Sequence, residues 1–234
     1  MQAAGLQFGD LPPTESLRPA GHAKISTAVR WVSREADGLY LQSQYGVLRI
    51  SPVGSAIMRL TFSKGSRLTA GVHPLISSEH VEKNWKYRDS TRTVDISTKE
   101  LTLSVDKPTG AIRYLDTSGR LLLAEQKNES RLLEASRSFL FLSLAKSEKL
   151  FGLVSGMKNP LPLRGSAKVL SAAGADRLPL LLSDAGYGLV PASAGVCFFC
   201  DIPAYGTYLC AQDTTQDYYF ITGKQQATIL NAYA

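Results

Sequence analysis

Apolar and polar residues alternate with a period of two along much of this chain, and that period limits the fold to β-sheets. Leu101, Leu103 and Val105 alternate with polar residues, which places one set of side chains in a core and the other set in water. A Pro-Thr-Gly turn sequence follows at 108–110, and two further short strand patterns, separated by a second turn sequence, continue to residue 124. This spacing predicts an antiparallel meander.

Further strand patterns occupy most of the remaining sequence, whereas helical periodicity is nearly absent. The strand patterns lie at residues 58–62, 139–145, 178–182, 187–190, 196–199, 207–210 and 218–221. The exception is 225–233, where Ile229, Leu230 and Tyr233 fall on one face of a predicted helix. Many short strands with frequent turns favour a two-sheet sandwich or a barrel, and therefore an all-β fold.

Length and composition exclude several other classes of protein. The chain has 234 residues, of which 44% are hydrophobic and 20% are charged; this is ordinary for a globular protein and unlike a disordered chain, a collagen or a coiled coil. A closed β/α barrel typically needs about 250 residues by itself, so the chain is short for a barrel enzyme. We predict one domain, preceded by an N-terminal arm over residues 1–24 that is rich in proline and poor in periodicity.

The sequence shows no sign of a membrane or secreted protein. No apolar run approaches the roughly 20 residues needed to cross a bilayer, and the first residues lack the basic and apolar regions of a secretory signal. Three cysteines, Cys197, Cys200 and Cys210, are an odd and small number, which fits a reducing compartment better than a disulfide scaffold. We therefore expect a cytoplasmic protein with no membrane partner.

The charge of the chain is mildly basic, with a formal net charge of +6. The densest basic stretch contains Lys83, Lys86, Arg88 and Arg92 with aromatic residues between them, a pattern that can stack on nucleic-acid bases. Acidic residues interrupt this stretch and no recognition module surrounds it, so we do not expect nucleic acid as a partner.

Motifs for the common catalytic and cofactor sites are missing from the sequence. Cys197 and Cys200 have the spacing of a metal or redox pair, but residues three positions apart on a strand face opposite sides. There is no Gly-x-Ser-x-Gly elbow, no phosphate-binding loop and no complete dinucleotide-binding fingerprint. We predict no metal site, no cofactor and no catalytic residue.

Glycoside chemistry would need two carboxylates on either side of the scissile bond. The candidates, by residue type alone, are Asp176, Asp184, Asp201, Asp213 and Asp217. Nothing in their spacing selects a pair. Aspartate commonly accepts backbone hydrogen bonds in turns, so we expect most of them to be turn residues.

Four segments nevertheless carry a recognisable pattern: 101–125 (strand, Pro-x-Gly turn, strand), 150–153 (Leu-Phe-Gly-Leu), 178–189 (Leu-Pro-Leu-Leu-Leu-Ser-Asp-Ala-Gly-Tyr-Gly-Leu) and 217–223 (Asp-Tyr-Tyr-Phe-Ile-Thr-Gly). In this order they resemble the N-terminal domain of glycoside hydrolase family 31, which includes α-glucosidases and α-xylosidases. The resemblance implies a large antiparallel two-sheet β-sandwich, the galactose mutarotase-like supersandwich, over residues 25–223. It also implies that 224–234 begin a helix that leads toward a catalytic barrel absent from this chain.

The function implied by the resemblance is that of a non-catalytic domain of a family 31-like α-glycoside hydrolase. The domain would line one wall of the sugar site and brace the barrel, and the chain alone is expected to be inactive. The implied partners are an α-linked glycan or small sugar and a catalytic barrel domain, in cis or in trans; a homo-oligomer is a further possibility. The family's nucleophile and general acid lie in the barrel, so no catalytic residue is carried over.

One substrate-binding residue is implied by the resemblance. The family's domain sends a loop toward the sugar, and Asp176 occupies the corresponding place before the strand pattern at 178–182. Its carboxylate would accept hydrogen bonds from sugar hydroxyls. The departures are Ala173 and Gly174, where the family often has Trp and Asn, and Val154-Ser155 in place of Gly-Glu. The alternative role of Asp176 is that of a turn residue.

Two other functions stay open from the sequence. The first is a free-standing carbohydrate-binding module, for which Tyr205, Tyr208, Tyr218 and Tyr219 provide aromatic rings. The second is a structural or interaction module that holds no ligand and has no hydrolase activity.

Overall fold

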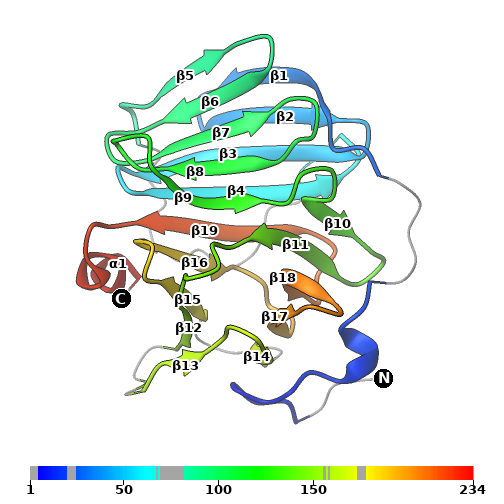
Figure 1. Ribbon diagram of the computed structural model, residues 1–234. Helices are drawn as coiled ribbons and strands as arrows, with labels where there is room; N and C mark the ends of the chain where they lie inside the picture. The colour runs from blue at the N-terminus through cyan, green and yellow to red at the C-terminus, as the bar shows by residue number, and fades with distance from the viewer. Residues whose placement is uncertain are drawn as a thin grey trace.

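The computed structural model places two antiparallel sheets face to face, which confirms the all-β prediction and settles it as a two-sheet sandwich (Figure 1). It describes residues 5–19, 25–66, 68, 82–154, 157, 159–172 and 178–233. The first sheet has nine strands and the second has ten.

In the first sheet the strand order is β1-β2-β3-β4-β19-β16-β15-β12-β13. Its strands are β1 (Val29–Glu35), β2 (Gly38–Ser43), β3 (Gly46–Gly54), β4 (Ile57–Lys64), β12 (Leu150–Leu153), β13 (Leu161–Pro162), β15 (Leu180–Ser183), β16 (Tyr187–Pro191) and β19 (Gln216–Thr222). The last strand of the chain, β19, therefore lies in the middle of the sheet, between β4 and β16.

In the second sheet the order is β14-β17-β18-β11-β9-β8-β7-β6-β5, with β10 paired to β11. Its strands are β5 (Lys86–Asp89), β6 (Thr93–Ser97), β7 (Thr102–Asp106), β8 (Ile112–Leu115), β9 (Leu121–Glu125), β10 (Arg131–Leu133), β11 (Ser138–Ser143), β14 (Ala167–Ser171), β17 (Cys197–Ile202) and β18 (Gly206–Ala211). The predicted meander is confirmed as β7-β8-β9, with Leu103 and Val105 buried and Ser104 between them only half-buried.

The turn between β7 and β8 depends on Gly110. Its backbone has φ of +71°, and a Cβ at this position would lie 2.2 Å from the carbonyl oxygen of Thr27. Glycine is the residue that adopts such a conformation without steric cost. The turn can therefore pack directly against the segment that leads into β1.

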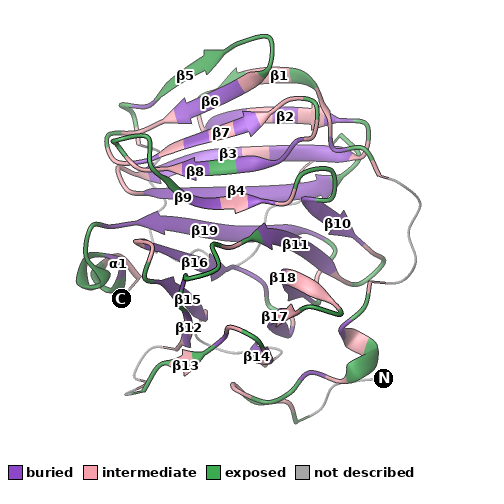
Figure 2. Ribbon diagram, in the orientation of Figure 1, coloured by how far each residue is buried: buried purple, intermediate pink, exposed green. Residues whose placement is uncertain are grey.

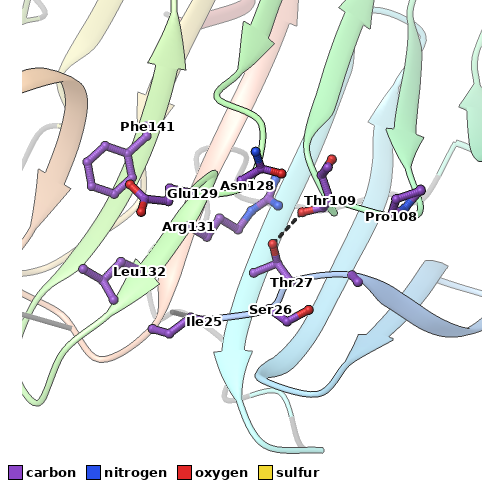
Figure 3. Close-up of a pocket in the computed structure, with 11 residues that line it drawn as sticks. Ile25, Ser26, Thr27, Pro108, Thr109, Asn128, Glu129, Arg131, Leu132 and Phe141 are labelled. Atoms are coloured by element: carbon purple, nitrogen blue, oxygen red, sulfur yellow. Dashed lines mark hydrogen bonds between the residues drawn. The ribbon is translucent and has the colours of Figure 1, made fainter. Parts of the chain in front are cut away.

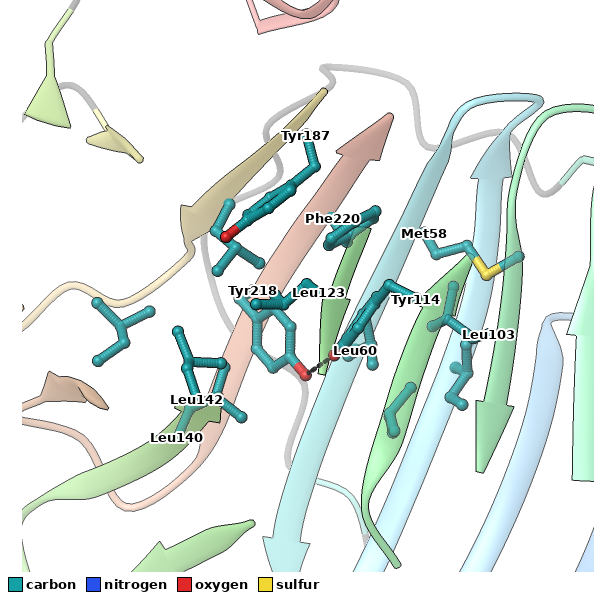
Figure 4. Packing of buried hydrophobic residues seen from close by; sticks show 14 of the residues in the cluster. Met58, Leu60, Leu103, Tyr114, Leu123, Leu140, Leu142, Tyr187, Tyr218 and Phe220 are labelled. Atoms are coloured by element: carbon teal, nitrogen blue, oxygen red, sulfur yellow. Dashed lines mark hydrogen bonds between the residues drawn. The ribbon is translucent and has the colours of Figure 1, made fainter. Parts of the chain in front are cut away.

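The main core fills the space between the two sheets (Figure 4). Tyr114 of the second sheet stacks on Phe220 of the first sheet, with ring centroids 4.3 Å apart, and Phe220 also stacks on Tyr187 at 5.4 Å. Leu60 and Leu103 are fully buried in the same cluster. Burial of apolar side chains from both sheets is the main force that holds them together.

The first sheet is buried on both faces in its centre, which differs from the simple in-and-out alternation of the sequence. In β4, Met58, Leu60 and Phe62 face the core as expected, but Arg59 and Thr61 are also buried, at 5% and 0% exposure. Figure 2 shows β4 and β19 as almost continuously buried strands. Alternation along a strand reveals its two faces, but not whether a second layer covers the outer one.

One part of that second layer is the predicted helix, which is confirmed as α1 (Gln226–Tyr233). Ile229 is fully buried and clusters with outer-face residues of the first sheet, including Val190, Tyr219 and Ile221. Leu230, predicted on the same face, is instead 36% exposed. The short helix therefore covers the sheet through a narrower stripe than the sequence indicates.

The described part of the N-terminal segment lies along the second sheet. Gly9 donates its N–H to the carbonyl of Val169 at 2.8 Å, and Val169 donates back to Asp10 at 2.8 Å. These bonds cover part of β14, the edge strand of that sheet. After the 3-10 turn η1 (Thr14–Ser16), Leu17 is buried against the outer face of the sheet, where Tyr208 donates a hydrogen bond to its carbonyl.

Neither helical element among the described residues is long and apolar enough to cross a membrane.

Candidate functional site

The predicted substrate-binding residue, Asp176, lies outside the described residues, but both flanks of its segment are described. The chain leaves the second sheet at Ser171, the last residue of β14, and is described again from Leu178, just before β15 of the first sheet. The carbonyl of Leu178 accepts a hydrogen bond from the Tyr233 hydroxyl of α1. Leu178 and Tyr233 also pack against the same outer apolar cluster. The segment that contains residue 176 therefore ends beside the terminal helix.

Three of the other candidate aspartates are held by backbone N–H groups. Asp184 accepts from Lys149 N–H at 2.9 Å, and Asp213 accepts from Thr215 N–H at 3.1 Å. Asp201 accepts from Gly165 N–H at 2.9 Å. The expectation of a turn residue is therefore confirmed for Asp184 and Asp213, whereas Asp201 lies in β17 and accepts from the turn before β14.

Asp201 also shows how its surroundings favour the charged form. Burial by itself would raise the pKa of this carboxyl group, but hydrogen bonds from Gly165, Arg164 and Thr207 lower the pKa overall. The Arg164 contact is an ion pair with an N–O distance of 2.8 Å. An aspartate held in this way is a fixed anion and not a proton donor at neutral pH.

Asp217 is the exception among the aspartates, because it forms a buried ion pair. Its two carboxylate oxygens accept from Arg59 at 3.0 and 2.7 Å, and one of them also accepts from Thr61 at 3.3 Å. The Arg59 guanidinium lies over the Tyr219 ring, 5.2 Å from its centroid. Sequence reasoning missed this pair because β4 and β19 are far apart in sequence and nothing local reveals their register. An arginine inside an apolar strand was the available signal.

A second buried ion pair lies at the inner face of the second sheet. Glu125 accepts hydrogen bonds from the hydroxyls of Tyr114 at 2.9 Å and Tyr218 at 3.1 Å, and it pairs with Arg131. The two tyrosine oxygens are 2.7 Å apart, as Figure 4 shows. Burial raises the pKa of Glu125, although Arg131 and the hydrogen bonds oppose that effect. This network joins the two sheets through the core.

A third buried carboxylate, Glu148, is also satisfied internally. One of its oxygens accepts from the hydroxyls of Ser183 at 2.7 Å and Tyr187 at 2.5 Å, and the other accepts from Ala145 N–H at 3.1 Å. Burial and the neighbouring carboxylate raise the pKa of the Tyr187 phenol. Together with the pairs above, Glu148 shows that the buried carboxylates serve packing and not an open reaction site.

The cysteines confirm the prediction that Cys197 and Cys200 face opposite sides of their strand. Cys197 belongs to the core between the sheets, whereas Cys200 and Cys210 belong to the outer cluster beneath Leu17. All three are free thiols, and burial raises the pKa of Cys197 to about 11. Within the described ranges, no group of three or more metal-ligating side chains could hold an ion.

The tyrosines that suggested a sugar platform are mostly buried. Tyr208, Tyr218 and Tyr219 are 0–1% exposed, so their rings pack in the protein and cannot stack on a sugar. Tyr205 is partly buried, and the guanidinium of Arg18 lies 5.3 Å from its ring centroid. These four residues therefore do not form a carbohydrate-binding surface.

The basic stretch forms β5, which is an edge strand of the second sheet, and the residues just before and after it. Trp85 is 7% exposed and lies under Arg34, whose guanidinium is 4.6 Å from the ring centroid. Arg88 forms an ion pair with Asp95 at 2.8 Å. Of Trp85 and Tyr87, only Tyr87 is exposed, at 41%. Trp85 thus closes the open edge of the sandwich and is not presented to a partner.

The architecture defines a class of protein: a large two-sheet antiparallel β-sandwich that is closed at one side by a C-terminal helix. No family model matches the sequence, and no curated protein matches it either. Solved structures do share the fold.

The similar structures are sugar-active enzymes. A Flavobacterium johnsoniae glycoside hydrolase family 31 dextranase, a mutant complexed with isomaltotriose, matches with a TM-score of 0.75 and 17% identity over 88% of this chain and 27% of its own. A family 31 α-xylosidase from a soil metagenome, complexed with xylose, matches with a TM-score of 0.71 and 15% identity. The match covers 86% of this chain and 33% of the xylosidase. The cycloalternan-forming enzyme of Listeria monocytogenes matches with a TM-score of 0.71 and 18% identity. The match covers 87% of this chain and 21% of that enzyme.

The comparisons therefore confirm, at the level of the fold, the resemblance to a domain of family 31 enzymes. This chain spans a third or less of the length of each of these proteins.

Proposed function

We propose that this chain is the non-catalytic β-sandwich domain of a family 31-like α-glycoside hydrolase, in which it lines one wall of the sugar site and braces a catalytic barrel. The observation that carries the proposal is the shared fold, which covers 88% of this chain and 27% of the dextranase. A domain that accounts for so small a share of an enzyme is expected to support chemistry carried out elsewhere.

The contact between Leu178 and Tyr233 supports the assignment of the sugar-facing edge. It joins the segment that contains Asp176 to α1, and in our proposal residues 224–234 lead from the sandwich toward the barrel. The Asp176 carboxylate would then accept hydrogen bonds from sugar hydroxyls at the junction of the two domains.

The proposed ligand is an α-linked glycan or a small sugar. Similar structures hold isomaltotriose, glucose and xylose, and we extend this ligand class to the present chain. The barrel would be supplied in cis or in trans. We further propose a cytoplasmic location, which the three free thiols support because reducing compartments keep cysteines unpaired.

The first experiment sequences the gene beyond the codon for Ala234 and assays the expressed chain for hydrolysis. We expect either a continuing reading frame or a co-purifying subunit that contains a β/α barrel with an acidic nucleophile. We also expect no hydrolysis of nitrophenyl α-glucoside or α-xyloside by residues 1–234 alone. Turnover by the isolated chain, or the absence of any barrel partner, would overturn the proposal.

The second experiment changes Asp176 in the assembly with the barrel. Because hydrogen bonds to a charged group contribute about 1.5–3 kcal/mol, Asp176→Asn should raise KM about tenfold or more while kcat changes little. Glu15→Gln provides the control, since Glu15 is an exposed carboxylate on the N-terminal segment. An unchanged KM in Asp176→Asn would leave Asp176 as a turn residue.

A further inference from the structure

A cavity of about 430 Å³ opens on the outer face of the second sheet. It lies where the segment entering β1 passes the turn between β7 and β8 and the loop before β10 (Figure 3). Its volume falls in the range of about 300–1,000 Å³ that is usual for small-molecule sites. The Leu178–Tyr233 contact lies on the outer face of the other sheet, so the two regions are on opposite sides of the sandwich.

One side of the cavity is apolar. Leu132 and Phe141 belong to the outer cluster of the second sheet, and Ile25 packs against it. In Figure 3, Ile25 and Leu132 lie across the cavity from Asn128 and Glu129, and the Phe141 ring borders it beside Glu129. Leu132 and Phe141 are 4% and 8% exposed, so this wall offers the edges of their side chains, beside the partly buried Ile25, to the non-polar part of a ligand.

The opposite side carries polar groups that are available to a ligand. The side chains of Asn128 and Glu129 are exposed and make no hydrogen bond or ion pair with any part of the chain that the structure describes. The Thr27 hydroxyl donates to the carbonyl of Thr109 at 2.6 Å, which leaves its oxygen free to accept. A carboxylate, an amide and a hydroxyl thus belong to residues that line one cavity.

The charge of the cavity is set by Glu129. Arg131 also lines the cavity, but it is 3% exposed and its guanidinium already pairs with Glu125 and donates to the carbonyl of Gly110 at 3.0 Å. The buried Nε of Arg131 has no hydrogen-bond partner within the described ranges. The arginine therefore does not present a free positive charge to a ligand, and among the described residues that line the cavity no other cation opposes the Glu129 carboxylate.

Asn128 gives this loop a defined shape. Its φ of +71° makes it the sole non-glycine residue with a left-handed backbone among those described. Asparagine tolerates this conformation better than most residues, and both Asn128 and its neighbour Glu129 line the cavity.

We propose that this cavity is a binding site for a neutral pyranose ring, either a free sugar or the end of a neutral glycan. The non-polar part of the ring would pack against Ile25 and the edge of Phe141, and the hydroxyls would bond to Glu129, Asn128 and Thr27. A neutral polyol matches a site that combines one carboxylate, an amide and a hydroxyl with an apolar wall. The site belongs to this chain alone and does not depend on the function proposed for Asp176.

The test is an NMR titration of the 234-residue chain with methyl α-D-glucopyranoside up to about 50 mM, far above a dissociation constant of about 1 mM, which corresponds to weak binding. We expect saturable shifts of the backbone amides of residues 25–28, 109 and 128–132. Glu129→Gln should weaken binding about tenfold, because a charge-assisted hydrogen bond is lost. Asn128→Gly should weaken it severalfold, since glycine keeps the backbone conformation and removes only the amide.

Controls and charged analogues make the result decisive. Glu15→Gln should bind like the unmodified chain, and the shifts should map to the cavity amides and not to those around Leu178, so a failure of the Asp176 proposal leaves this one intact. Methyl α-D-glucuronide should bind at least about tenfold more weakly than the glucoside because Glu129 repels it, and Glu129→Gln should remove most of that difference. No saturable shift, shifts unaffected by both cavity variants, or binding of a 2-amino-2-deoxyglucoside without binding of the glucoside would overturn the proposal.

Discussion

Charged residues inside the sandwich are kept in pairs, and the Glu125–Arg131 pair allows the cost of breaking one to be measured. Arg131→Met leaves Glu125 buried without its cation. Removing one partner of a buried pair typically destabilises a protein by about 3–5 kcal/mol, whereas removing both can be nearly neutral. We expect Arg131→Met to show this loss in urea unfolding and Glu125→Gln/Arg131→Met to recover most of it. Equal stability of the single variant and the unmodified chain would contradict the role of the pair.

The buried thiols predict a specific chemical reactivity. Only the thiolate reacts quickly with disulfide reagents, and the three cysteines are buried. We expect almost no labelling of the native chain by an aromatic disulfide reagent at pH 8 and labelling of all three thiols in guanidinium chloride. Rapid labelling of the native chain would show that the sandwich opens locally.

Cys197 adds a prediction about pH. Its folded pKa is raised by burial from 9.0 to about 11, so the folded state holds the proton more tightly than the unfolded state does. The resulting stability is complete below pH 9 and is lost as the pH rises toward 11. In urea unfolding, the stability of the unmodified chain relative to Cys197→Ala should therefore decrease between pH 9 and 11. A difference that stays constant over this interval would contradict the raised pKa.

At the scale of elements, two glycines in similar hairpin turns should respond differently to the same substitution. Gly110 and Gly119 both have positive φ, but a Cβ at Gly110 would meet the Thr27 backbone, whereas a Cβ at Gly119 would meet open space. Left-handed backbone costs a non-glycine residue about 1–2 kcal/mol. We expect Gly119→Ala to lose roughly that amount and Gly110→Ala to lose clearly more in urea unfolding. Equal losses would mean that the Thr27 segment moves aside freely.

The terminal helix offers a comparison between neighbouring residues. Ile229 is fully buried against the first sheet, and Leu230 is 36% exposed. Truncating a buried aliphatic side chain to alanine typically costs about 2–5 kcal/mol, so Ile229→Ala should lower the free energy of unfolding far more than Leu230→Ala. If the two variants lose similar amounts, the helix does not dock as described.

The sequence predicts the strands and the helix of this fold better than it predicts which of them lie side by side. The meander β7-β8-β9 follows from local alternation and turn residues, and α1 follows from a 3.6-residue period. The burial of Arg59 does not, because it depends on Asp217, which lies on a strand 158 positions away. The same limit applies to the candidate site: residue types mark aspartates, but only the three-dimensional contacts show that Asp184, Asp201 and Asp213 are held by backbone N–H groups.

The cavity residues were likewise invisible in the sequence. Thr27, Glu129 and Phe141 belong to segments that meet only when the chain entering β1 crosses the second sheet. Their patterns are those of ordinary strands and loops, so no spacing singled them out. An asparagine at position 128 was a weak signal of a left-handed turn.

At the scale of the molecule, the N-terminal segment protects a sheet edge and an apolar face. Removing residues 1–19 would take away Leu17 and so expose β14 and the apolar cluster around Tyr208. Unprotected strand edges and large apolar patches promote association. We expect the shortened chain to elute from a size-exclusion column as concentration-dependent oligomers, in contrast to the full chain. A shortened chain that elutes as the full chain does would show that the segment is dispensable for protection.

The central position of β19 has a consequence for how the protein is made. Its pairing with β4 joins residues near the two ends of the sandwich, and such distant contacts slow folding because a long loop must close first. During synthesis, β4 leaves the ribosome with one hydrogen-bonding edge unfilled until residues 216–222 have been translated. The first sheet is therefore expected to be completed only after β19 has been translated, so the growing chain carries an unpaired strand edge until then.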